Sequence, residues 1–285
     1  MMNSKVAAIQ MVTCADIEKN LDTAARLISS AAAEGANLVL LPEVFAVLEG
    51  GPMRAYGEVE GGTGKEGVIQ DFLATQAKKH KLVVVGGTIP LISRPGSQGV
   101  ASDRLIEDGR VRAACLVYDA NGEQIARYDK IHLFDVVVND QQSKYSESRS
   151  YEAGEEIVCV ETSVGRLGLS VCYDMRFPEL YRELFRRDAE IVTVPAAFTK
   201  VTGEAHWEPI LKARAIENQC YVIAAGQGGR HSQTRETWGH SMIIDPWGKI
   251  LAQVAEGEGY AIAEIDLAYL NQIRERMPIK DHLKL

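Results

Sequence analysis

GLSVCYDMRFPEL, residues 168–180, joins a short apolar run to a charged segment that begins at a proline. The apolar residues predict a buried strand over 167–171, and Pro178 suits the first turn of a helix that runs to Arg187. Cys172 therefore lies at a strand–turn–helix corner. Main-chain N–H groups at such a corner can bind an oxyanion, so Cys172 is a candidate nucleophile.

The rest of the chain repeats this alternation of short strands and amphipathic helices. Asp16 is the predicted cap of the first helix, Gly35 ends it, and Asn121-Gly122 predicts a hairpin turn. Because no linker interrupts the pattern, we expect one α/β domain with helices outside its sheets. Strands are expected at 6–11, 38–41, 82–89, 111–118, 124–130, 157–161, 167–171, 191–194, 221–225, 241–244, 250–254 and 260–265. Helices are expected at 16–32, 68–77, 178–187, 204–218 and from Asp266.

Two polar stretches interrupt this alternation. A loop rich in Gly, Ser and Pro is predicted around residues 93–102, and a longer irregular segment over 135–156. Ordinary connections are much shorter than the second segment. It is therefore a candidate functional loop.

The composition excludes several classes of protein. The chain has 285 residues, with 31 basic and 39 acidic side chains and a formal net charge of −8. A protein that binds nucleic acid normally presents a basic face, so no nucleic-acid partner is expected. The longest apolar stretches are too short to span a bilayer, so no membrane partner is expected, and neither is a secretory signal. Five cysteines without C-x-x-C spacing argue against a disulfide framework and indicate a reducing, cytoplasmic compartment.

Two glycine-rich segments look like cofactor loops but lack the residues that such loops need. In residues 61–66 (GGTGKE), Glu66 stands where a phosphate loop has Ser or Thr, and Val59 occupies the first glycine position. Residues 226–230 (GQGGR) follow a predicted strand but open no helix. The 6 histidines show no metal-ligand spacing. We therefore expect neither a cofactor nor a metal ion.

Three reactive side chains, those of Glu43, Lys130 and Cys172, stand at the ends of predicted strands. Ligands gather at the carboxyl ends of strands in α/β proteins, so these groups are expected to converge on one site that supports acyl transfer. Each residue alone has a commoner explanation: a helix cap or surface acid, a solvated lysine, and a small core residue. Their coincidence favours a catalytic function.

The same residues suggest how the thiol becomes reactive. A free cysteine has a pKa of about 8.5. The ammonium of Lys130 and the helix that begins at Pro178 would both lower the pKa of Cys172. The other four cysteines lie within strands, at a strand start or in a loop, and we interpret them as inert.

Three segments together resemble the signatures of the nitrilase superfamily of carbon–nitrogen hydrolases. They are Leu41–Glu43 (LPE), Tyr128–Phe134 (YDKIHLF) and Val171–Leu180 (VCYDMRFPEL). Their order and the pattern between them match over nearly the whole chain. The resemblance implies an α/β fold of the αββα sandwich type, formed by a single domain over residues 1–285, with a C-terminal tail from about residue 277.

The resemblance also implies roles for individual residues. Glu43, Lys130 and Cys172 would form a Glu–Lys–Cys triad, in which the sulfur attacks an amide carbonyl and water later hydrolyses the thioester. Glu147 matches a further glutamate that would orient Lys130 or the amide. The main-chain N–H of Tyr173 would hold the oxyanion together with Lys130.

Other segments are most similar to the deaminated glutathione amidase branch of the family. They are 175–178 (MRFP), 205–208 (AHWE), 213–222 (ARAIENQCYV), 229–231 (GRH) and 239–248 (GHSMIIDPWG). The branch implies hydrolysis of deaminated glutathione to 2-oxoglutarate and cysteinylglycine. The carboxylate of the α-keto acid would bind Arg176 and Thr199, although Arg176 suits a solvated charge at a helix start equally well.

Three alternative functions remain open at this point. They are an ω-amidase acting on 2-oxoglutaramate, another carbon–nitrogen specificity such as an N-carbamoyl hydrolase, and a catalytically silent binding protein of the same fold. The resemblance also implies a homodimer or higher homo-oligomer, joined by the helices that begin at Pro178 and Glu204 and by the C-terminal tail. On these helices, Tyr181, Phe185 and Trp207 are the aromatic side chains that could support such an interface.

Overall fold

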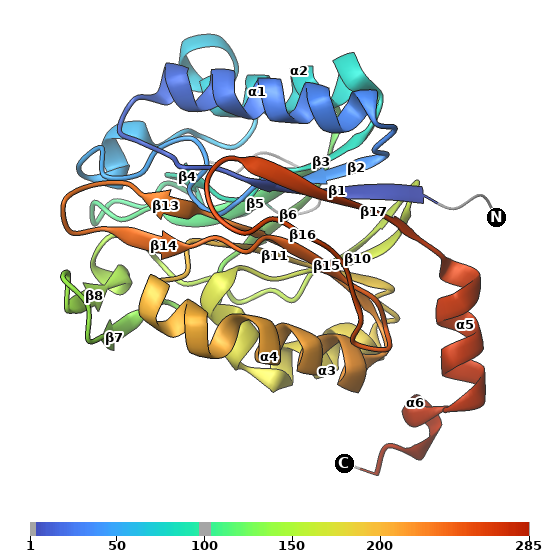
Figure 1. Cartoon of the computed structure of the whole chain (residues 1–285). Coiled ribbons are helices and arrows are strands. Elements are labelled where there is room, and N and C mark those ends of the chain that lie inside the picture. Colours follow the sequence, from blue (N-terminus) through green and yellow to red (C-terminus); the bar gives the residue numbers. More distant parts are fainter. Residues whose placement is uncertain (1–3, 97–103, 285) are drawn as a thin grey trace.

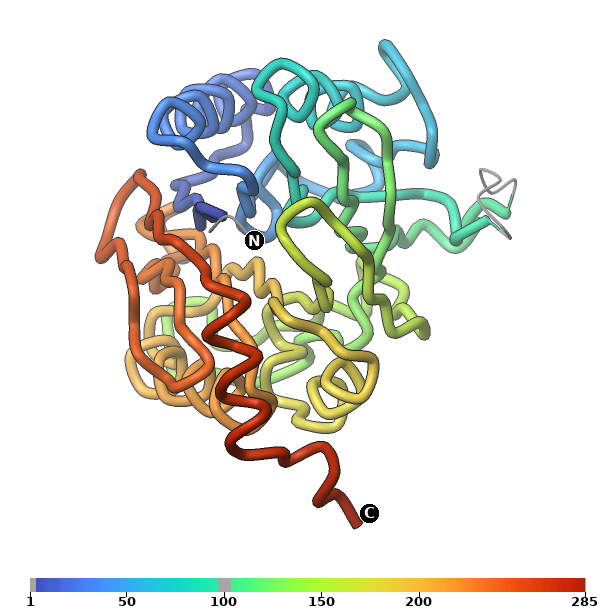
Figure 2. The backbone as a smooth tube through the Cα atoms, turned by 90° about the vertical axis from the view of Figure 1, so that its right-hand side faces the viewer, coloured from blue at the N-terminus to red at the C-terminus, as the bar shows by residue number. Residues whose placement is uncertain are grey.

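The computed structural model describes residues 4–96 and 104–284, so most of the loop predicted around 93–102 lies outside the described residues. Two β-sheets lie face to face, and helices cover the outer face of each sheet (Figure 1). Figure 2 shows the same arrangement from the side, with the blue and cyan N-terminal part above the yellow and orange part. The predicted αββα sandwich is confirmed.

The first sheet contains seven strands in the order β17-β1-β2-β3-β5-β4, with β6 paired to β5. β2 is parallel to β3, β3 is antiparallel to β5, and β5 is antiparallel to β6. β2 and β6 therefore run in the same direction, and their carboxyl ends lie at the same edge. The strands are β1 (Ser4–Gln10), β2 (Leu38–Leu40), β3 (Val83–Val85), β4 (Ile89–Leu91), β5 (Arg112–Tyr118), β6 (Gln124–Asp129) and β17 (Gly259–Ile265).

The side chains of β1 point alternately to the two faces of this sheet, and both faces are apolar. Val6 and Ala8 belong to the apolar cluster that contains the second sheet. Ala7 and Ile9 belong to the cluster beneath helices α1 (Ile17–Ala33) and α2 (Val68–His80). Because successive side chains of a strand point to opposite faces, a continuous apolar run fills both clusters.

The second sheet contains six strands in the order β16-β15-β12-β11-β10-β9, of which β10, β11 and β12 are parallel. Helices α3 (Pro178–Arg186) and α4 (Lys200–Asn218) cover its outer face (Figure 1). The strands are β9 (Cys159–Thr162), β10 (Gly165–Leu169), β11 (Ile191–Ala196), β12 (Tyr221–Gly226), β15 (Met242–Ile244) and β16 (Ile250–Gln253).

The single strand predicted over 82–89 is wrong, because the structure divides it into β3 and β4. Gly87, between them, has a φ of +54°. A Cβ atom at this position would lie 2.0 Å from the carbonyl oxygen of Pro42. Glycine alone suits this conformation and this close approach. The break places the turn beside the segment that carries Glu43.

The segment over 135–156 holds more regular structure than predicted. It contains a hairpin of β7 (Asp135–Val137) and β8 (Lys144–Ser146), followed by the 3-10 helix η3 (Glu147–Arg149). A second hairpin, of β13 (Gly228–Arg230) and β14 (Glu236–Trp238), is missing from the prediction altogether. Strands of three residues are too short to show a periodic pattern. Two further 3-10 helices are η1 (Met53–Tyr56) and η2 (Gly64–Glu66).

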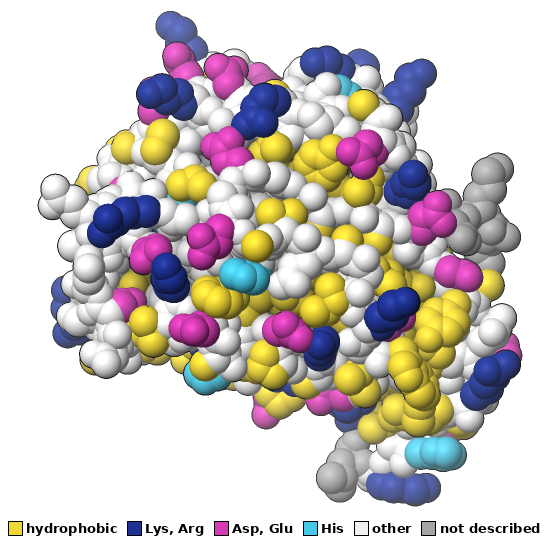
Figure 3. Space-filling view, in the orientation of Figure 1, with side chains coloured by type: hydrophobic (Ala, Val, Ile, Leu, Met, Phe, Trp, Pro, Cys, Tyr) yellow, Lys and Arg dark blue, Asp and Glu magenta, His cyan; other side chains and the backbone are white. Residues whose placement is uncertain are grey.

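The C-terminal region leaves the sandwich. α5 (Leu267–Arg276) begins at the predicted Asp266, whose carboxylate caps it, and α6 (Ile279–His282) lies apart from the sheets (Figures 1 and 2). None of the helices in the described part of the chain is long and apolar enough to cross a membrane. On the face drawn in Figure 3, basic and acidic side chains are interspersed.

The aromatic side chains predicted to support a dimer interface lie inside the chain instead. Tyr181, Phe185 and Trp207 are all buried in the described part of the chain, with Tyr181 and Trp207 in the apolar cluster beneath the second sheet. Tyr181 and Trp207 fill this cluster because α3 and α4 direct their apolar faces toward the sheet. They therefore offer no support for a contact between subunits.

Candidate active site

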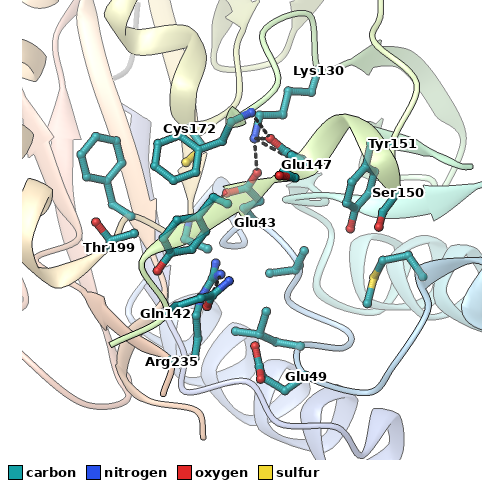
Figure 4. Close-up of a pocket in the computed structure, with 18 of the residues that line it drawn as sticks. Glu43, Glu49, Lys130, Gln142, Glu147, Ser150, Tyr151, Cys172, Thr199 and Arg235 are labelled. Carbon is teal, nitrogen blue, oxygen red and sulfur yellow. Dashed lines mark hydrogen bonds and ion pairs between the residues drawn. The ribbon is translucent and has the colours of Figure 1, made fainter. Parts of the chain in front are cut away.

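A pocket of about 480 Å³ lies between the ends of the two sheets (Figure 4). Glu43 follows β2, Lys130 follows β6, and Cys172 begins the 3-10 helix η4 (Cys172–Arg176) just after β10; all three line the pocket. The first sheet thus supplies the carboxylate and the ammonium, and the second sheet supplies the thiol. A pocket of this size is typical of sites for small molecules.

Lys130 is buried between two carboxylates. Its Nζ donates to Oε1 of Glu43 at 2.8 Å and to the two oxygens of Glu147 at 2.8 and 2.9 Å. Burial alone would lower the pKa of Lys130, but the carboxylates of Glu147 and Glu43 outweigh it and hold this pKa well above its ordinary value. Lys130 is therefore a firmly held ammonium.

Glu147 reaches Lys130 from η3, in the segment predicted as a functional loop. Its Oε2 also accepts a hydrogen bond from the main-chain N–H of Phe134 at 2.6 Å. Burial raises the pKa of Glu147, and the nearby Lys130 opposes this rise. The structure thus brings together all four residues that the sequence predicts as catalytic.

Glu43 is fixed through both of its carboxylate oxygens. Oε1 accepts from Lys130, and Oε2 accepts from the main-chain N–H of Ala197 at 2.8 Å. The next residue, Val44, has a positive φ of 52°, and its N–H donates to Oγ1 of Thr88 at 2.9 Å. This turn directs the Glu43 side chain back into the pocket.

Cys172 has the strained backbone expected of a sharp corner, with a φ of +49°. Its thiol does not have the lowered pKa that the sequence suggests. Burial, followed by the Glu43 carboxylate, raises the pKa of Cys172 well above its ordinary value, and the Lys130 ammonium opposes them without prevailing. The prediction omitted the cost of burying a thiolate. Cys172 is a neutral thiol beside a carboxylate that can accept its proton.

Asp174 joins the Lys130 segment to the Cys172 segment, and the sequence patterns did not single it out. It is fully buried, and its Oδ2 accepts from the Tyr128 hydroxyl at 2.6 Å and from the N–H of Val171 at 2.8 Å. Its Oδ1 accepts from the N–H of His132 at 3.0 Å and lies 2.7 Å from Nδ1 of the same residue. The role of Asp174 is visible only once the two segments are adjacent.

Comparison with known proteins identifies the family. A carbon-nitrogen hydrolase family model matches residues 5–275. The chain belongs to the carbon–nitrogen hydrolase family. It is 40% identical to the deaminated glutathione amidase of Yersinia enterocolitica over 99% of this chain and 93% of that protein. It is 44% identical to the deaminated glutathione amidase of Synechocystis sp. over 97% of this chain and 96% of that protein.

A solved structure confirms the likeness in three dimensions. The crystal structure of Saccharomyces cerevisiae Nit3, a member of branch 10 of the nitrilase superfamily, matches this chain with a TM-score of 0.82 and 31% sequence identity. The match covers 97% of this chain and 94% of Nit3. The predicted family and its fold are therefore both confirmed.

The residues predicted to bind substrate in this carbon–nitrogen hydrolase lie in different places. Thr199 lines the pocket, and its hydroxyl lies 2.7 Å from that of Thr202. Tyr173 belongs to the first turn of η4, where main-chain N–H groups lack acceptors within the helix. Arg176 lies outside the lining of the pocket, with its guanidinium carbon 5.1 Å from the ring centre of Phe198 and its Nη1 3.3 Å from Nδ1 of His206.

Other pocket residues of the hydrolase were not predicted individually. Gln142 and Tyr145 come from the β7–β8 hairpin, inside the segment that its length had marked as functional. Arg235 comes from the turn between β13 and β14, a hairpin without a sequence signal. Within residues 4–96 and 104–284, no group of three or more His, Cys, Asp or Glu side chains could hold a metal ion.

Proposed function

We propose that this carbon–nitrogen hydrolase is a cysteine amidase that cleaves deaminated glutathione to 2-oxoglutarate and cysteinylglycine. The observation that carries the proposal is the contact of Lys130 with Glu43 and Glu147 in the pocket that also contains Cys172. The names of the full-length relatives support the choice of substrate. We take residues 1–285 as one catalytic domain with a C-terminal tail.

The first half of the reaction forms a thioester. Glu43 accepts the proton of the Cys172 thiol as the sulfur attacks the amide carbonyl, so no thiolate needs to accumulate beforehand. The raised pKa of Cys172 supports this order of events. Glu43 then gives its proton to the amide nitrogen, the C–N bond breaks, and cysteinylglycine leaves as an amine.

The second half reverses these roles. Glu43 takes a proton from an incoming water molecule, whose oxygen attacks the thioester carbonyl. The C–S bond then breaks, the sulfur recovers a proton from Glu43, and the second carboxylate of 2-oxoglutarate is formed. One carboxylate thus serves as base and acid in turn, as microscopic reversibility requires.

Lys130 and the main-chain N–H of Tyr173 stabilise the oxyanion in both halves. A preorganised donor of this kind typically lowers the barrier by about 2.7–4 kcal/mol. Glu147 holds the ammonium of Lys130 in place through two hydrogen bonds of 2.8 and 2.9 Å. Thr199, which lines the pocket, contacts the acyl group. Arg176 adds positive charge behind Phe198 for the α-keto acid carboxylate.

We further propose a homodimer in the cytoplasm, joined through α3, α4 and the C-terminal tail. Support comes from half-exposed apolar side chains on α4, namely Val201 at 46% and Ile216 at 50% exposure. α6 also projects away from the sandwich, where an ion pair of its Lys280 with Asp188 holds it and a partner can contact it. Sedimentation equilibrium of the full chain, before and after removal of residues 278–285, tests this arrangement.

The decisive test of the proposed function compares deaminated glutathione with 2-oxoglutaramate as substrates of the purified enzyme. We expect deaminated glutathione to be preferred, and intact-mass measurement to reveal a 2-oxoglutaroyl group on the wild type that Cys172→Ala lacks. A preference for 2-oxoglutaramate would indicate an ω-amidase. Normal turnover by Cys172→Ala would overturn the mechanism, and a protein acylated by no amide would be a silent binding protein.

A further inference from the structure

The pocket contains an arginine that forms no ion pair with a carboxylate of the described residues, although Glu49 also lines the pocket. Lys130 and Arg235 are the basic residues among the described residues of its lining. Lys130 is held by Glu43 and Glu147. Within residues 4–96 and 104–284, Arg235 forms no ion pair, and its Nε is buried without a hydrogen-bond partner. Its guanidinium therefore has N–H donors that an acceptor on a ligand in the pocket could satisfy.

The Arg235 side chain is held ready for such a ligand. Its Nη1 donates to Oε1 of Gln142 at 3.3 Å, and its guanidinium carbon lies 5.1 Å from the ring centre of Tyr145. Its main-chain N–H donates to Oγ of Ser232 at 3.1 Å, which closes the turn that carries it. These contacts orient the guanidinium while leaving other N–H groups available.

Arg235 lies at the outer end of the pocket. It also borders a smaller cavity of about 190 Å³, whose lining includes the exposed Lys200, Gln233 and Glu236. In contrast, Cys172 and Ala197 are buried at the inner end. In Figure 4, Arg235 and Gln142 lie on the opposite side of Glu43 from Lys130.

The order of product release decides which end of the substrate meets Arg235. After the first half-reaction the acyl group stays bonded to Cys172, while the amine departs and water takes its place. The leaving amine must therefore lie between the thioester and solvent. Groups at the outer end of the pocket consequently face the leaving amine, and groups at the inner end face the acyl group.

We propose that Arg235, together with Gln142, binds a carboxylate carried by the leaving amine, and so selects amides whose amine part is a short peptide with a free C-terminus. This inference rests on the proposed function, in which cysteinylglycine is the leaving group. A guanidinium presents paired N–H donors that match the two oxygens of a carboxylate. 2-Oxoglutaramate releases only ammonia and cannot use this subsite.

Steady-state kinetics of Arg235→Met test the subsite. We expect kcat/KM for deaminated glutathione to fall about 10- to 100-fold, mainly through KM, as for the loss of a hydrogen bond to a charged group. Hydrolysis of 2-oxoglutaramate should be unchanged. Arg235→Lys should recover part of the loss, because it keeps the charge but not the paired donors. Arg230→Met, on the exposed part of the same hairpin, is the control with the same change in net charge.

A substrate analogue tests the subsite from the side of the ligand. The analogue is deaminated glutathione with its C-terminal carboxylate converted to a carboxamide. The kcat/KM of the wild type should be lower for this analogue by the same factor that Arg235→Met loses on deaminated glutathione. The kcat/KM of Arg235→Met should be the same for the two compounds. If Arg235→Met lost the same factor in kcat/KM for deaminated glutathione and for 2-oxoglutaramate, Arg235 would face the α-keto acid end of the substrate, and the proposal would be overturned. An unchanged kcat/KM in Arg235→Met, or full activity of the wild type on the carboxamide, would also overturn it.

A binding measurement separates this inference from the proposed function. If the wild type does not cleave deaminated glutathione, the proposed function fails. The subsite is then judged by calorimetric binding of cysteinylglycine to Cys172→Ala, which the added change Arg235→Met must weaken. Equal binding by the two proteins, or no binding by either, would reject the subsite.

Discussion

The hydroxyl of Tyr128 donates a hydrogen bond of 2.6 Å to the carboxylate of Asp174. Tyr128 lies two residues before Lys130, and Asp174 lies two residues after Cys172. Burial, aided by the Asp174 carboxylate, raises the pKa of Tyr128 well above its ordinary value, so its hydroxyl remains a donor. This contact fixes the ammonium-bearing segment of the first sheet relative to the thiol-bearing segment of the second.

Asp174→Asn should therefore impair both stability and catalysis. An amide oxygen cannot replace both carboxylate oxygens as acceptors for Tyr128, Val171 and His132. We expect a loss of about 1–3 kcal/mol in the free energy of unfolding and a fall in kcat of about 100-fold through misplacement of the reacting groups. Urea denaturation and steady-state kinetics measure the two effects. Tyr128→Phe removes one donor. Its free energy of unfolding should be lower by about 1 kcal/mol, and it should keep most of its kcat.

Glu43→Gln should slow acylation strongly while preserving the shape of the site. The amide can still accept from Lys130 or Ala197, but it cannot accept the proton of Cys172. We expect kcat to fall by a factor of about 10²–10⁴. Intact-mass measurement after mixing with substrate should detect no acyl group. Glu66→Gln, an exposed acid of η2, is the control, and rapid acylation of Glu43→Gln would assign the base to another residue.

Lys130→Met should separate catalysis from stability. Removing the ammonium leaves Glu43 and Glu147 as buried carboxylates without their partner, which costs about 3–5 kcal/mol. It also removes an oxyanion donor, so kcat should fall about 10²–10³-fold. The double variant Lys130→Met/Glu147→Gln should regain part of the stability without regaining activity. Thermal and urea unfolding provide the measurement, and Lys79→Met, an exposed lysine of α2, is the control.

A contrary outcome for this pair is easily recognised. If the double variant recovered kcat as well as stability, Lys130 would act only by neutralising Glu147. If Lys130→Met were as stable as the wild type, the two carboxylates would not be buried as anions in the folded protein.

The pH dependence of stability should report the raised pKa of Cys172. Folding favours the neutral thiol, so the corresponding stability is present below the ordinary pKa of about 8.5 and is lost as the pH rises through the higher folded-state value. Cys172→Ala lacks this dependence. Above about pH 9, the free energy of unfolding of the wild type should therefore fall relative to that of Cys172→Ala. Urea denaturation at a series of pH values measures it, and a difference that stays constant would contradict the neutral thiol.

Much of the fold could be predicted because its signals are local. The apolar run of β1, the Asp16 cap of α1 and the Pro178 start of α3 each depend on a few neighbouring residues. The prediction over 82–89 was wrong because Gly87 is required by a contact with Pro42, more than forty residues away in the chain. A propensity scale contains no such contact.

The residues of the candidate site likewise divide into those that local sequence signals reveal and those that they do not. Glu43, Lys130 and Cys172 could be found because each stands at the end of an apolar run, and the family signatures identified Glu147. Arg235 could not be found, because its hairpin has strands of only three residues and its importance depends on its forming no ion pair within the described residues.

The sequence by itself determined the family, the αββα layers and the kinds of side chain at the site, since short motifs and apolar periodicity carry that information. Only the tertiary structure decided that burial raises the pKa of the Cys172 thiol, that Asp174 joins the two sheets and that Arg235 forms no ion pair within the described residues. These properties arise from burial and from contacts between distant segments. They depend on the sum of everything packed around a group, which no local stretch of the chain contains.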